Sequence, residues 1–452
     1  MPQLAIDAGY AYLLHGLLLA ACAYLISTLP PRATSSRHWL LAQLLSVGVL
    51  AFFTFVVSEP PRVLEDFRTA YFRAGQAVSI GPAELIAELQ RGVDGFVNLP
   101  VVAYLFAPLA MLPSRGADIV FTALGLLAIL VAWYGLSVCF DLQRRERMLL
   151  LLLFAACGPL HNSVKEGNTS HIVLLLLVGA LLSLRHRREF LAGALLGFAA
   201  IIKLPLLLFG AYAILRRQWQ LLAGGATVCV AVVLSSLLVF GWSAHLTWYE
   251  EVLAPYSTGQ VLAFNVQSVR AFLGRMIFDS TVLTNWSPVE LSSTVRVLST
   301  VLCLTLLAIF TAVVLRPAIH PHSSNLLQTR TAIEFSLVLV LSCVLSPLSW
   351  SHYYCWLLVP AALFLAARER LTLARSSARL GLVGVVLTLP PILMPPASFG
   401  EKGWYVHFGV SYLFLAACMM TFALMLARVS LSSRIPSDVA FAGGAVPDRH
   451  VT

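Results

Sequence analysis

Residues 191–215 read LAGALLGFAAIIKLPLLLFGAYAIL, an apolar run interrupted by one charged residue, Lys203. Pro205 cannot continue a helix, so the run divides near its middle. At about 1.5 Å per residue, neither half crosses a hydrocarbon core roughly 30 Å thick. The two halves therefore form a broken span or lie beside a water-filled cavity. A lysine at that depth is costly unless it faces water or an anion, so we expect a pivot at Lys203 with a cavity beside it.

The rest of the chain has the same apolar character. Of its 452 residues, 59% are apolar and 11% are charged, against about 45–50% and 25% in an average soluble domain. This composition excludes a cytosolic enzyme, a disordered scaffold and a fibrous protein, and the short alternating segments of a membrane barrel are absent. Runs that span or nearly span a bilayer are 10–29, 39–57, 117–140, 148–161, 171–184, 190–202, 204–215, 220–241, 291–315, 333–347, 354–367, 380–396 and 406–427. We therefore predict an all-α polytopic membrane protein with about 12–13 transmembrane helices.

Basic residues are concentrated in alternate loops. Most of the 30 Lys and Arg residues, and few of the acids, lie in loops 30–38, 141–147, 185–189, 216–219, 316–332 and 368–379 and in the tail after 427. The positive-inside rule makes these loops cytoplasmic. We therefore predict a multi-pass protein of the plasma (inner) membrane with its N-terminus outside and its C-terminus in the cytoplasm. The net charge of +9 then reflects orientation, and no nucleic-acid partner is expected.

The opposite set of segments faces outward and is where we expect the chemistry. It comprises 58–116, 242–290 and the turn at 395–405. Residues 98–113 are apolar enough for another span, but a span there would invert every later loop, so we predict outer juxtamembrane helices instead. No internal repeat is visible. We predict a single transmembrane domain over residues 1–427 and a cytoplasmic tail over 428–452 with disordered composition.

Two adjacent acids, Glu65 and Asp66, follow the second apolar run at the expected membrane edge. A carboxylate there is a candidate general base, because nearby hydrocarbon raises its pKa while a polar substrate still reaches it. Asp66 also opens a segment compatible with helix through Tyr71. A helix N-cap is therefore the alternative, and composition alone favours the cap. The two adjacent acids could instead bind a divalent cation, so a metal site is a further alternative, although no DxD motif is present.

The sequence KEGNTSH at 165–171 is predicted to form an outer turn between two short spans. Asn168 suits a turn, and the plain interpretation of Lys165 and Glu166 is a solvated ion pair. Lys203 is different, because an unpaired ammonium does not persist in apolar surroundings. An anionic partner such as a phosphate is one interpretation of Lys203, and snorkelling of its ammonium to the interface is the other.

Two more outer segments carry polar residues. SPLSWSHYY at 346–354 contains Trp350, which suits a membrane interface, and His352. A histidine there donates to a phosphate oxygen, although most such histidines are structural. In the second large outer segment, Asn265 and Arg270 present an amide and a guanidinium. The arginine either binds an oxyanion or meets lipid headgroups, and the segment itself favours neither.

Five motifs, taken in order, resemble those of glycosyltransferase family 87, a GT-C-fold group that includes polyprenyl-phosphate-mannose-dependent mannosyltransferases of cell-envelope biosynthesis. They are DFRTAYFRAG at 66–75, FVNLPVVAYLFAPLAMLP at 96–113, GNTSHIVLLLL at 167–177, AGALLGFAAIIKLPLLL at 192–208 and SPLSWSHYY at 346–354. The chain departs from the family pattern at Asn98, where Tyr is expected, at Asn168, where Gln is expected, and at Tyr353, where a second His is expected.

The resemblance implies a GT-C-like fold and a membrane enzyme. It would move mannose or a similar hexose from a polyprenyl-phosphate donor to a lipid or glycan acceptor on the outer face, with inversion. Asp66 would be the general base, and Lys203, His352 and Arg270 would bind the donor phosphate. Possible substrate-binding residues are Glu65, Tyr71, Lys165, Asn168, Asn265 and Trp350. No metal or other cofactor is expected where such cations meet the phosphate.

A secondary transporter or lipid flippase is the alternative from another class. In such a protein Asp66, Glu166 and Lys203 would line a transport route rather than catalyse. Transporters usually contain inverted repeats, and none is visible. The long outer segment at 58–116 suits a catalytic lid better. A purely structural subunit would leave the outer acids and lysines unexplained, and the sequence indicates no oligomeric state.

Overall fold

The architecture is almost entirely helical. In this computed structural model the described residues are 8–28, 41, 44, 45, 48, 49, 63–92, 95–317, 324–367, 375–392 and 404–433. Within them, the only strands are β1 (Gly259–Gln260) and β2 (Val289–Glu290), which pair antiparallel with Gly259 opposite Glu290. The predicted all-α class is confirmed.

The helices divide into a bundle and two further groups, named outer groups because they lie in segments 58–116 and 242–290, which are predicted to face outward. The bundle contains α1 (Ala8–Thr28), α6 (Ser114–Cys139), α7 (Arg144–Ala156), α8 (Gly158–Lys165), α9 (Ser170–Arg185), α10 (Glu189–Ile202), η5 (Leu204–Leu207), α11 (Leu208–Leu215), α12 (Trp219–Trp248), α15 (Ser293–Leu315), α16 (Ser324–Leu345), η8 (Ser351–Leu357), α17 (Leu358–Ala367), α18 (Arg375–Leu387), α19 (Trp404–Val410) and α20 (Tyr412–Ser433). The first outer group contains η2 (Phe67–Tyr71), α3 (Phe72–Ile80), α4 (Pro82–Leu89), η4 (Pro100–Leu105) and α5 (Ala107–Ala110). The second contains η6 (Tyr249–Leu253), α13 (Pro255–Thr258), α14 (Val269–Arg275) and η7 (Ser280–Thr284).

Five of the described helices are long and apolar enough to cross a bilayer. They are Ser114–Cys139, Trp219–Thr258, Ser293–Leu315, Gln328–Leu345 and Tyr412–Leu431. A sixth span results if α7 and α8, which meet at a bend of 52°, count as one. Six further apolar helices have 10–17 residues. By length and composition this is a multi-pass membrane protein, and the expected span at 39–57 lies largely outside the described residues.

The helix α10 stops where the sequence predicts a pivot. It ends at Ile202, and Lys203 is extended, with φ −137° and ψ 92°. Pro205 then lies in the first turn of η5, which leads directly into α11. The break therefore leaves Lys203 at the end of a helix and inside the protein, where only 4% of the residue is exposed. This confirms the pivot.

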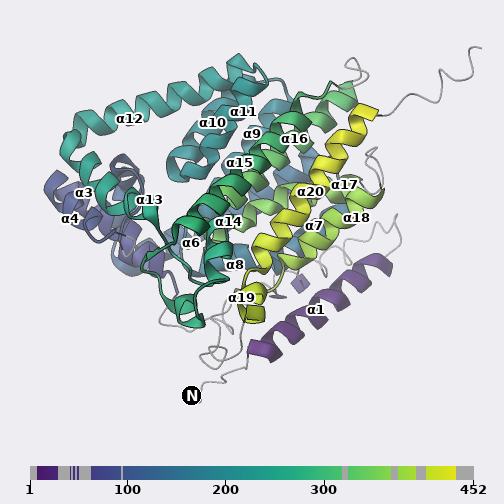
Figure 1. Ribbon diagram of the computed structural model, residues 1–452, viewed down its shortest axis with the longest axis horizontal. Coiled ribbons are helices and arrows are strands. Elements are labelled where there is room, and N and C mark those ends of the chain that lie inside the picture. Colours follow the sequence, from purple (N-terminus) through teal and green to yellow (C-terminus); the bar gives the residue numbers. More distant parts are fainter. Residues whose placement is uncertain are drawn as a thin grey trace, which may run out of the picture.

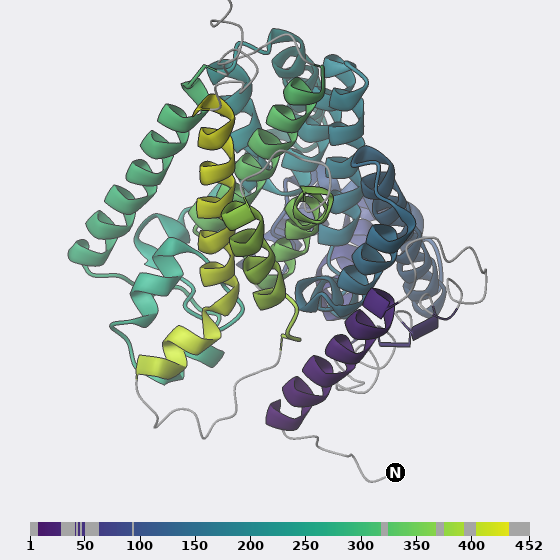
Figure 2. The same cartoon turned by 90° about the vertical axis from the view of Figure 1, so that its right-hand side faces the viewer.

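A second break, between α7 and α8, is stabilised by two histidines. Cys157 adopts φ −71° and ψ 107° and ends α7. The Nε2 of His161 lies 2.6 Å from the carbonyl oxygen of Ala155, and the Nε2 of His15 on α1 lies 3.0 Å from that of Ala156. These contacts satisfy carbonyls that the end of a helix leaves without partners. They also attach α1, which lies at the edge of the bundle in Figure 2, to α7.

Small residues allow α10 and α12 to pack backbone against backbone. A Cβ at Gly193 would lie 1.9 Å from the carbonyl oxygen of Leu221, and one at Gly224 would lie 2.0 Å from that of Phe190. In a bilayer, such close contacts are a main source of helix association, because lipid tails are as apolar as the side chains. The contact holds α10 against the long α12 (Figure 1) and thereby fixes the position of the pivot at its end.

A buried ion cluster joins the end of α11 to α16 and α20. Glu334 has a side chain only 1% exposed, and its Oε1 accepts hydrogen bonds from Nε of Arg330 at 2.8 Å and Nε of Arg428 at 2.7 Å. The Nε of Arg216 lies 3.2 Å from the other carboxylate oxygen. All three arginines come from segments that are predicted to be cytoplasmic. Loss of the carboxylate would leave three neighbouring positive charges without their common partner, one of them on the fully buried Arg428, which is strongly destabilising.

The end of the domain differs slightly from the sequence prediction. The helix α20 continues to Ser433, so residues 428–433 are helical rather than part of a disordered tail. The reason is Arg428, which is 0% exposed and hydrogen-bonded to Glu334. This contact extends the packed face of α20 beyond its apolar run. The remaining residues of the predicted tail, 434–452, lie outside the described residues.

The first outer group packs into a second hydrophobic core, which it shares with residues of α6, α10 and α12. Phe67 stacks on Phe121 with 4.3 Å between ring centroids, and Tyr71 stacks on Phe106 with 4.7 Å. The helices η4 and α5 have six and four residues, so the apolar segment 98–113 is too short in its helices to cross a bilayer.

In Figure 1, α3 and α4 lie at the left of the molecule, where α12 ends, and the indole of Trp248 at that end donates to the carbonyl oxygen of Val97 at 3.2 Å. A Cβ at Gly92, just after α4, would lie 3.3 Å from the carbonyl oxygen of Glu251 in η6. The two outer groups therefore meet at one end of the bundle.

Cysteine labelling tests the predicted orientation. A side chain at Gly81 meets no atom within 4 Å, and Ser376 is exposed on α18, in a loop predicted to be cytoplasmic. In a cysteine-free background, we expect Gly81→Cys to react with an impermeant maleimide in intact cells. Ser376→Cys should react only after lysis. The reverse pattern would place Asp66 on the cytoplasmic side and contradict the predicted topology.

Candidate active site

Backbone contacts hold Asp66 against the turn that follows α8. Leu64 donates its N–H to the carbonyl oxygen of Lys165 at 2.6 Å, and Phe67 donates to that of Glu166 at 3.3 Å. Gly167, with φ +69°, turns the chain so that Asn168 faces the same segment. Residues far apart in the sequence are thereby fixed next to one another.

The side chain of Asp66 binds across this contact and does not cap its own helix. Asp66 precedes η2 but makes no capping hydrogen bond, so the alternative interpretation as an N-cap is wrong. Its Oδ2 accepts a hydrogen bond from Nδ2 of Asn168 at 2.7 Å. The same amide nitrogen lies 3.4 Å from the hydroxyl of Tyr71. Glu65, by contrast, is exposed.

Lys203 reaches the other end of the same amide. Its Nζ donates to Oδ1 of Asn168 at 3.1 Å and lies 4.9 Å from the ring centroid of Tyr353. With 4% of the residue exposed, the ammonium is inside the protein, so snorkelling to the interface is wrong. A cation over an aromatic face is stabilised without being neutralised, so the positive charge remains available to an anion.

Burial controls the electrostatics of the acids. It raises the pKa of Asp66 above its ordinary value, while the hydrogen bond from Asn168 and the charge of Lys203 oppose the rise and Glu65 adds to it. Burial also raises the pKa of Glu166 to about 7, against the charge of Lys165, whose Nζ is 3.6 Å from its carboxylate. An acid is deprotonated above its pKa, so the raised value brings Asp66 closer to the range of an effective base near neutral pH.

His352 is placed by the pairing of two distant segments. Gln267 donates its N–H to the carbonyl oxygen of Ser349 at 2.6 Å, and Ser351 donates to that of Asn265 at 2.7 Å. The next residue, His352, is 7% exposed, and its Nε2 has no hydrogen-bond partner among the described residues. An unpaired buried nitrogen is costly, so this one is available for a substrate group.

Tyr353 links His352 to Lys203. The rings of His352 and Tyr353 have centroids 5.1 Å apart, and Lys203 lies over the Tyr353 ring. Tyr353 occupies the position where the motif predicts a second histidine. Sequence reasoning did not select it as a site residue, although its place next to His352 was a signal. The structure therefore brings together Asp66, Tyr71, Asn168, Lys203 and His352.

Of three further predicted site residues, Trp350 lies beside His352, whereas Asn265 and Arg270 bind other partners. The Oδ1 of Asn265 accepts from the indole of Trp286 at 3.1 Å, and Trp350 is nearly parallel to His352 at 6.4 Å between centroids. Arg270 donates to the carbonyl oxygens of Tyr256 and Ser257, at 2.9 and 3.4 Å. These contacts tie Arg270 to the second outer group, and within the described part of the chain its guanidinium makes no hydrogen bond to Asn168. 

Asn98 is a buried residue that sequence reasoning noted only as a departure from the motif. It is 6% exposed, its Nδ2 donates to the carbonyl oxygen of Ile202 at 2.7 Å, and its Oδ1 has no partner in the described part of the chain. The bond fixes the juxtamembrane segment to the end of α10, one residue before Lys203. No group of three or more His, Cys, Asp or Glu side chains suited to a metal occurs among the described residues.

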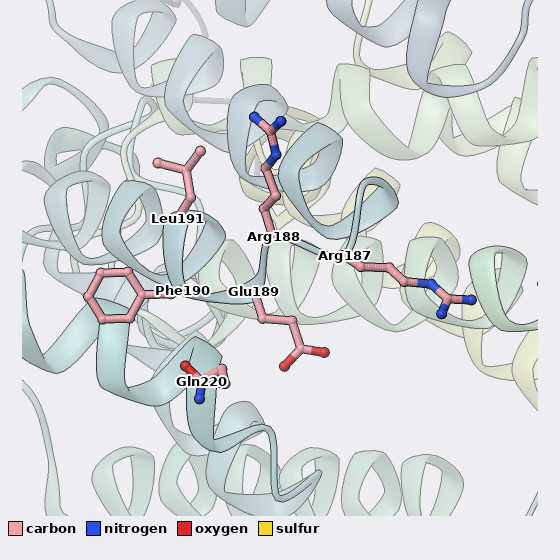
Figure 3. Close-up of a pocket in the computed structure, with 6 residues that line it drawn as sticks. All are labelled: Arg187, Arg188, Glu189, Phe190, Leu191 and Gln220. Atoms are coloured by element: carbon pink, nitrogen blue, oxygen red, sulfur yellow. The ribbon is translucent and has the colours of Figure 1, made fainter.

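A separate pocket lies at the other end of α10. It has a volume of about 440 Å³ and is lined by Arg187, Arg188, Glu189, Phe190, Leu191 and Gln220. Figure 3 shows the two arginine side chains pointing in different directions, so they do not converge on one ligand. The length of α10, about 20 Å, separates this pocket from Lys203. It contains none of the predicted site residues.

Fold and site together define a multi-pass, all-helical membrane protein with an acid, an amide and a lysine in contact at the meeting point of its broken helices. The family model described as glycosyltransferase family 87 matches residues 96–347, more than half of the chain. The chain belongs to this family, with which the GT-C fold is consistent, and is a glycosyltransferase that uses a sugar donor and an acceptor. No curated protein matches the chain significantly. Asn168 and Lys203 lie inside the matched range, and Asp66 and His352 lie outside it.

Replacing Gly167 tests how the site is assembled. A Cβ there would lie 2.6 Å from Cβ of Phe67, and φ is +69°. We expect Gly167→Ala to destabilise the protein by about 1–3 kcal/mol through crowding and by about 1–2 kcal/mol more through its backbone conformation. Thermal unfolding in detergent measures this change. Gly210→Ala on α11 is the control, since a side chain there meets no atom within 4 Å; equal effects would contradict the proposed contact.

Proposed function

We propose that this glycosyltransferase transfers mannose or a similar hexose from a polyprenyl-phosphate donor to a lipid or glycan acceptor at the outer face of the plasma membrane. The observation that carries the proposal is the pair of opposite charges, Asp66 and Lys203, held at the two ends of the Asn168 amide. The reaction needs one group of each kind, because it removes a proton from the acceptor and releases an anion from the donor.

Asp66 is the proposed general base. Its carboxylate takes the proton of the acceptor hydroxyl while that oxygen attacks the anomeric carbon. The bond between the anomeric carbon and the phosphate oxygen breaks on the opposite face, so the configuration inverts. Partial burial supports this role, because it raises the pKa of Asp66 while leaving the residue partly exposed to a substrate. Glu65, which precedes it, and Tyr71, whose hydroxyl lies near the same Asn168 nitrogen, are proposed contacts for the acceptor or sugar.

Lys203 and His352 are the proposed partners of the departing phosphate. The ammonium retains donors beyond the one that Asn168 accepts, and Nε2 of His352 has no protein partner among the described residues. Both contacts would strengthen as negative charge gathers on the leaving oxygen. They would therefore lower the free energy of the transition state more than that of the bound donor. Arg270 uses two donors on backbone carbonyls and keeps others for an anion. We therefore retain it as an outer contact, with Lys165, Asn265 and Trp350.

A flippase or transporter is the second candidate, and the two broken helices near Cys157 and Lys203 favour it, because transporters use such breaks at their binding sites. One assay separates the functions. Purified protein in liposomes is given radiolabelled polyprenyl-phosphate mannose and a lipid extract as acceptor. A new labelled glycolipid supports the transferase with this donor. Movement of the intact donor between leaflets without product supports the flippase.

Asp66→Asn tests the general base. The amide oxygen still accepts the hydrogen bond from Asn168, so folding should persist, but an amide cannot take a proton. We expect turnover to fall by about 10²–10⁴-fold at an unchanged melting temperature. In the wild type, turnover should decline as the pH falls through the raised pKa of Asp66, because a protonated carboxyl group cannot accept the proton of the acceptor. The control is Asp118→Asn, which removes only the surface ion pair with Arg68; near-normal turnover of Asp66→Asn would refute the base.

Replacing Lys203 and His352 tests the phosphate contacts. Lys203→Met keeps length and apolar packing and removes the charge, and His352→Ala removes the unpaired nitrogen. Each should lose about 1.5–3 kcal/mol of transition-state stabilisation per charged hydrogen bond, seen in single-turnover rate more than in donor affinity. Both quantities are measured with the labelled donor. Normal rates in both variants would show that the phosphate is bound elsewhere, for example at Arg270 or by a divalent cation.

A further inference from the structure

The amide of Asn168 is fully occupied by groups of the protein. Nδ2 faces Asp66 and the hydroxyl of Tyr71, at 2.7 and 3.4 Å. Oδ1 accepts from Nζ of Lys203 at 3.1 Å and from both the N–H and the hydroxyl of Ser170, at 3.2 and 3.0 Å. An amide has two N–H groups and two lone pairs, and only 4% of Asn168 is exposed. This leaves Asn168 little capacity to bind a substrate directly.

Chemistry fixes the orientation of this amide. An ammonium only donates hydrogen bonds and an ionised carboxylate only accepts them. Turning the amide over would therefore set its N–H groups against Lys203 and its oxygen against Asp66. The two charged residues stay at opposite ends of one planar group. No direct ion pair within 4.0 Å joins them in the part of the chain that the structure describes.

A direct ion pair between Lys203 and Asp66 would weaken both groups in their proposed roles. An ammonium touching Asp66 would make the carboxylate a weaker base, and the carboxylate would occupy the ammonium. The ion cluster at Glu334 shows the alternative in the same protein, because there the charges touch and hold helices together. At Asp66 the intervening amide keeps the charges close, yet separate.

We propose that Asn168 is a positioning residue, an amide spacer that holds Asp66 and Lys203 apart and directs each toward its own reactant. This inference rests on the proposed function and assigns a role within the same site. It gives Asn168 a different task from the substrate contact expected from the sequence. It also explains why Ser170 donates two hydrogen bonds to the amide, since these fix the plane in which both charged groups are held.

The test must account for every charged or titratable group near Asp66. Glu65 and Tyr71 come from its own segment, Glu166 from the turn after α8, Lys203 from the end of α10 and Tyr353 from η8. Removing one neighbouring carboxylate simplifies the measurement. The tryptic peptide at 63–68 is VLEDFR, and in a Glu65→Gln background Asp66 is its only carboxyl side chain.

Dicyclohexylcarbodiimide reads the protonation of Asp66 without any substrate, because it modifies protonated carboxyl groups. Mass spectrometry of the peptide gives labelling against pH. In Asn168→Asp, the new carboxylate lies beside Lys203 and keeps its charge, so the shared proton goes to Asp66. We expect the labelling midpoint to rise by about 1–3 pH units. In Asn168→Ala the spacer is absent and Lys203 closes on Asp66. A direct ion pair lowers the pKa of the carboxyl group by more than the lost amide hydrogen bond raises it, so the midpoint should fall.

Opposite shifts distinguish a spacer from a merely structural residue, which would change stability alone. Asn162→Asp is the matched control, since its buried amide donates to the hydroxyl of Ser351 rather than to Asp66; its shift should be much smaller. Equal midpoints in wild type, Asn168→Asp and Asn168→Ala would overturn the inference. Failure of the proposed function would appear separately, as normal turnover in Asp66→Asn or no transfer from the labelled donor, while the labelling shifts remained.

Discussion

The hydrogen bonds that Asn168 makes to Asp66 and Lys203 are the interaction on which the arrangement of this protein depends. A charge buried in an apolar bundle must have a partner, and these residues come from three separate parts of the chain. The turn at Gly167 brings Asn168 to the segment of Asp66, and the break before Pro205 ends α10 at Lys203. Close packing of α10 on α12 then keeps that end in place.

The protein uses buried charge in two ways. Around Glu334, three arginines contact one carboxylate directly, and the result is a connection between helices. At the candidate site, an amide stands between Asp66 and Lys203, and the lysine lies over the ring of Tyr353. Charges that are satisfied by hydrogen bonds and aromatic faces, yet not neutralised by contact, remain available to a reaction. This difference in local geometry separates the structural cluster at Glu334 from the candidate site at Asp66 and Lys203.

Family membership and site geometry contribute different parts of the functional conclusion. The matched range, 96–347, includes the scaffold of broken helices together with Asn168 and Lys203, and it makes the protein a glycosyltransferase. Asp66 and His352 lie on either side of that range. Their proposed roles rest on contacts: the bond from Asn168 to Asp66, and the pairing of the segments near Asn265 and Ser351 that places His352. The nature of the sugar and acceptor belongs to the proposal.

The sequence by itself determined the membrane class, the helical fold and the pivot at Lys203, because hydrocarbon thickness and the chemistry of proline act on local runs of residues. It also placed Asp66, Lys203 and His352 among the candidates. Only the tertiary structure decided that Asp66 does not cap its helix, that Lys203 is inside rather than snorkelling, and that Asn168 lies between them. The buried contact of Arg428 with Glu334 also extends α20 to Ser433, beyond its apolar run. These outcomes depend on contacts between residues more than thirty positions apart, for which no local pattern in one sequence carries a signal.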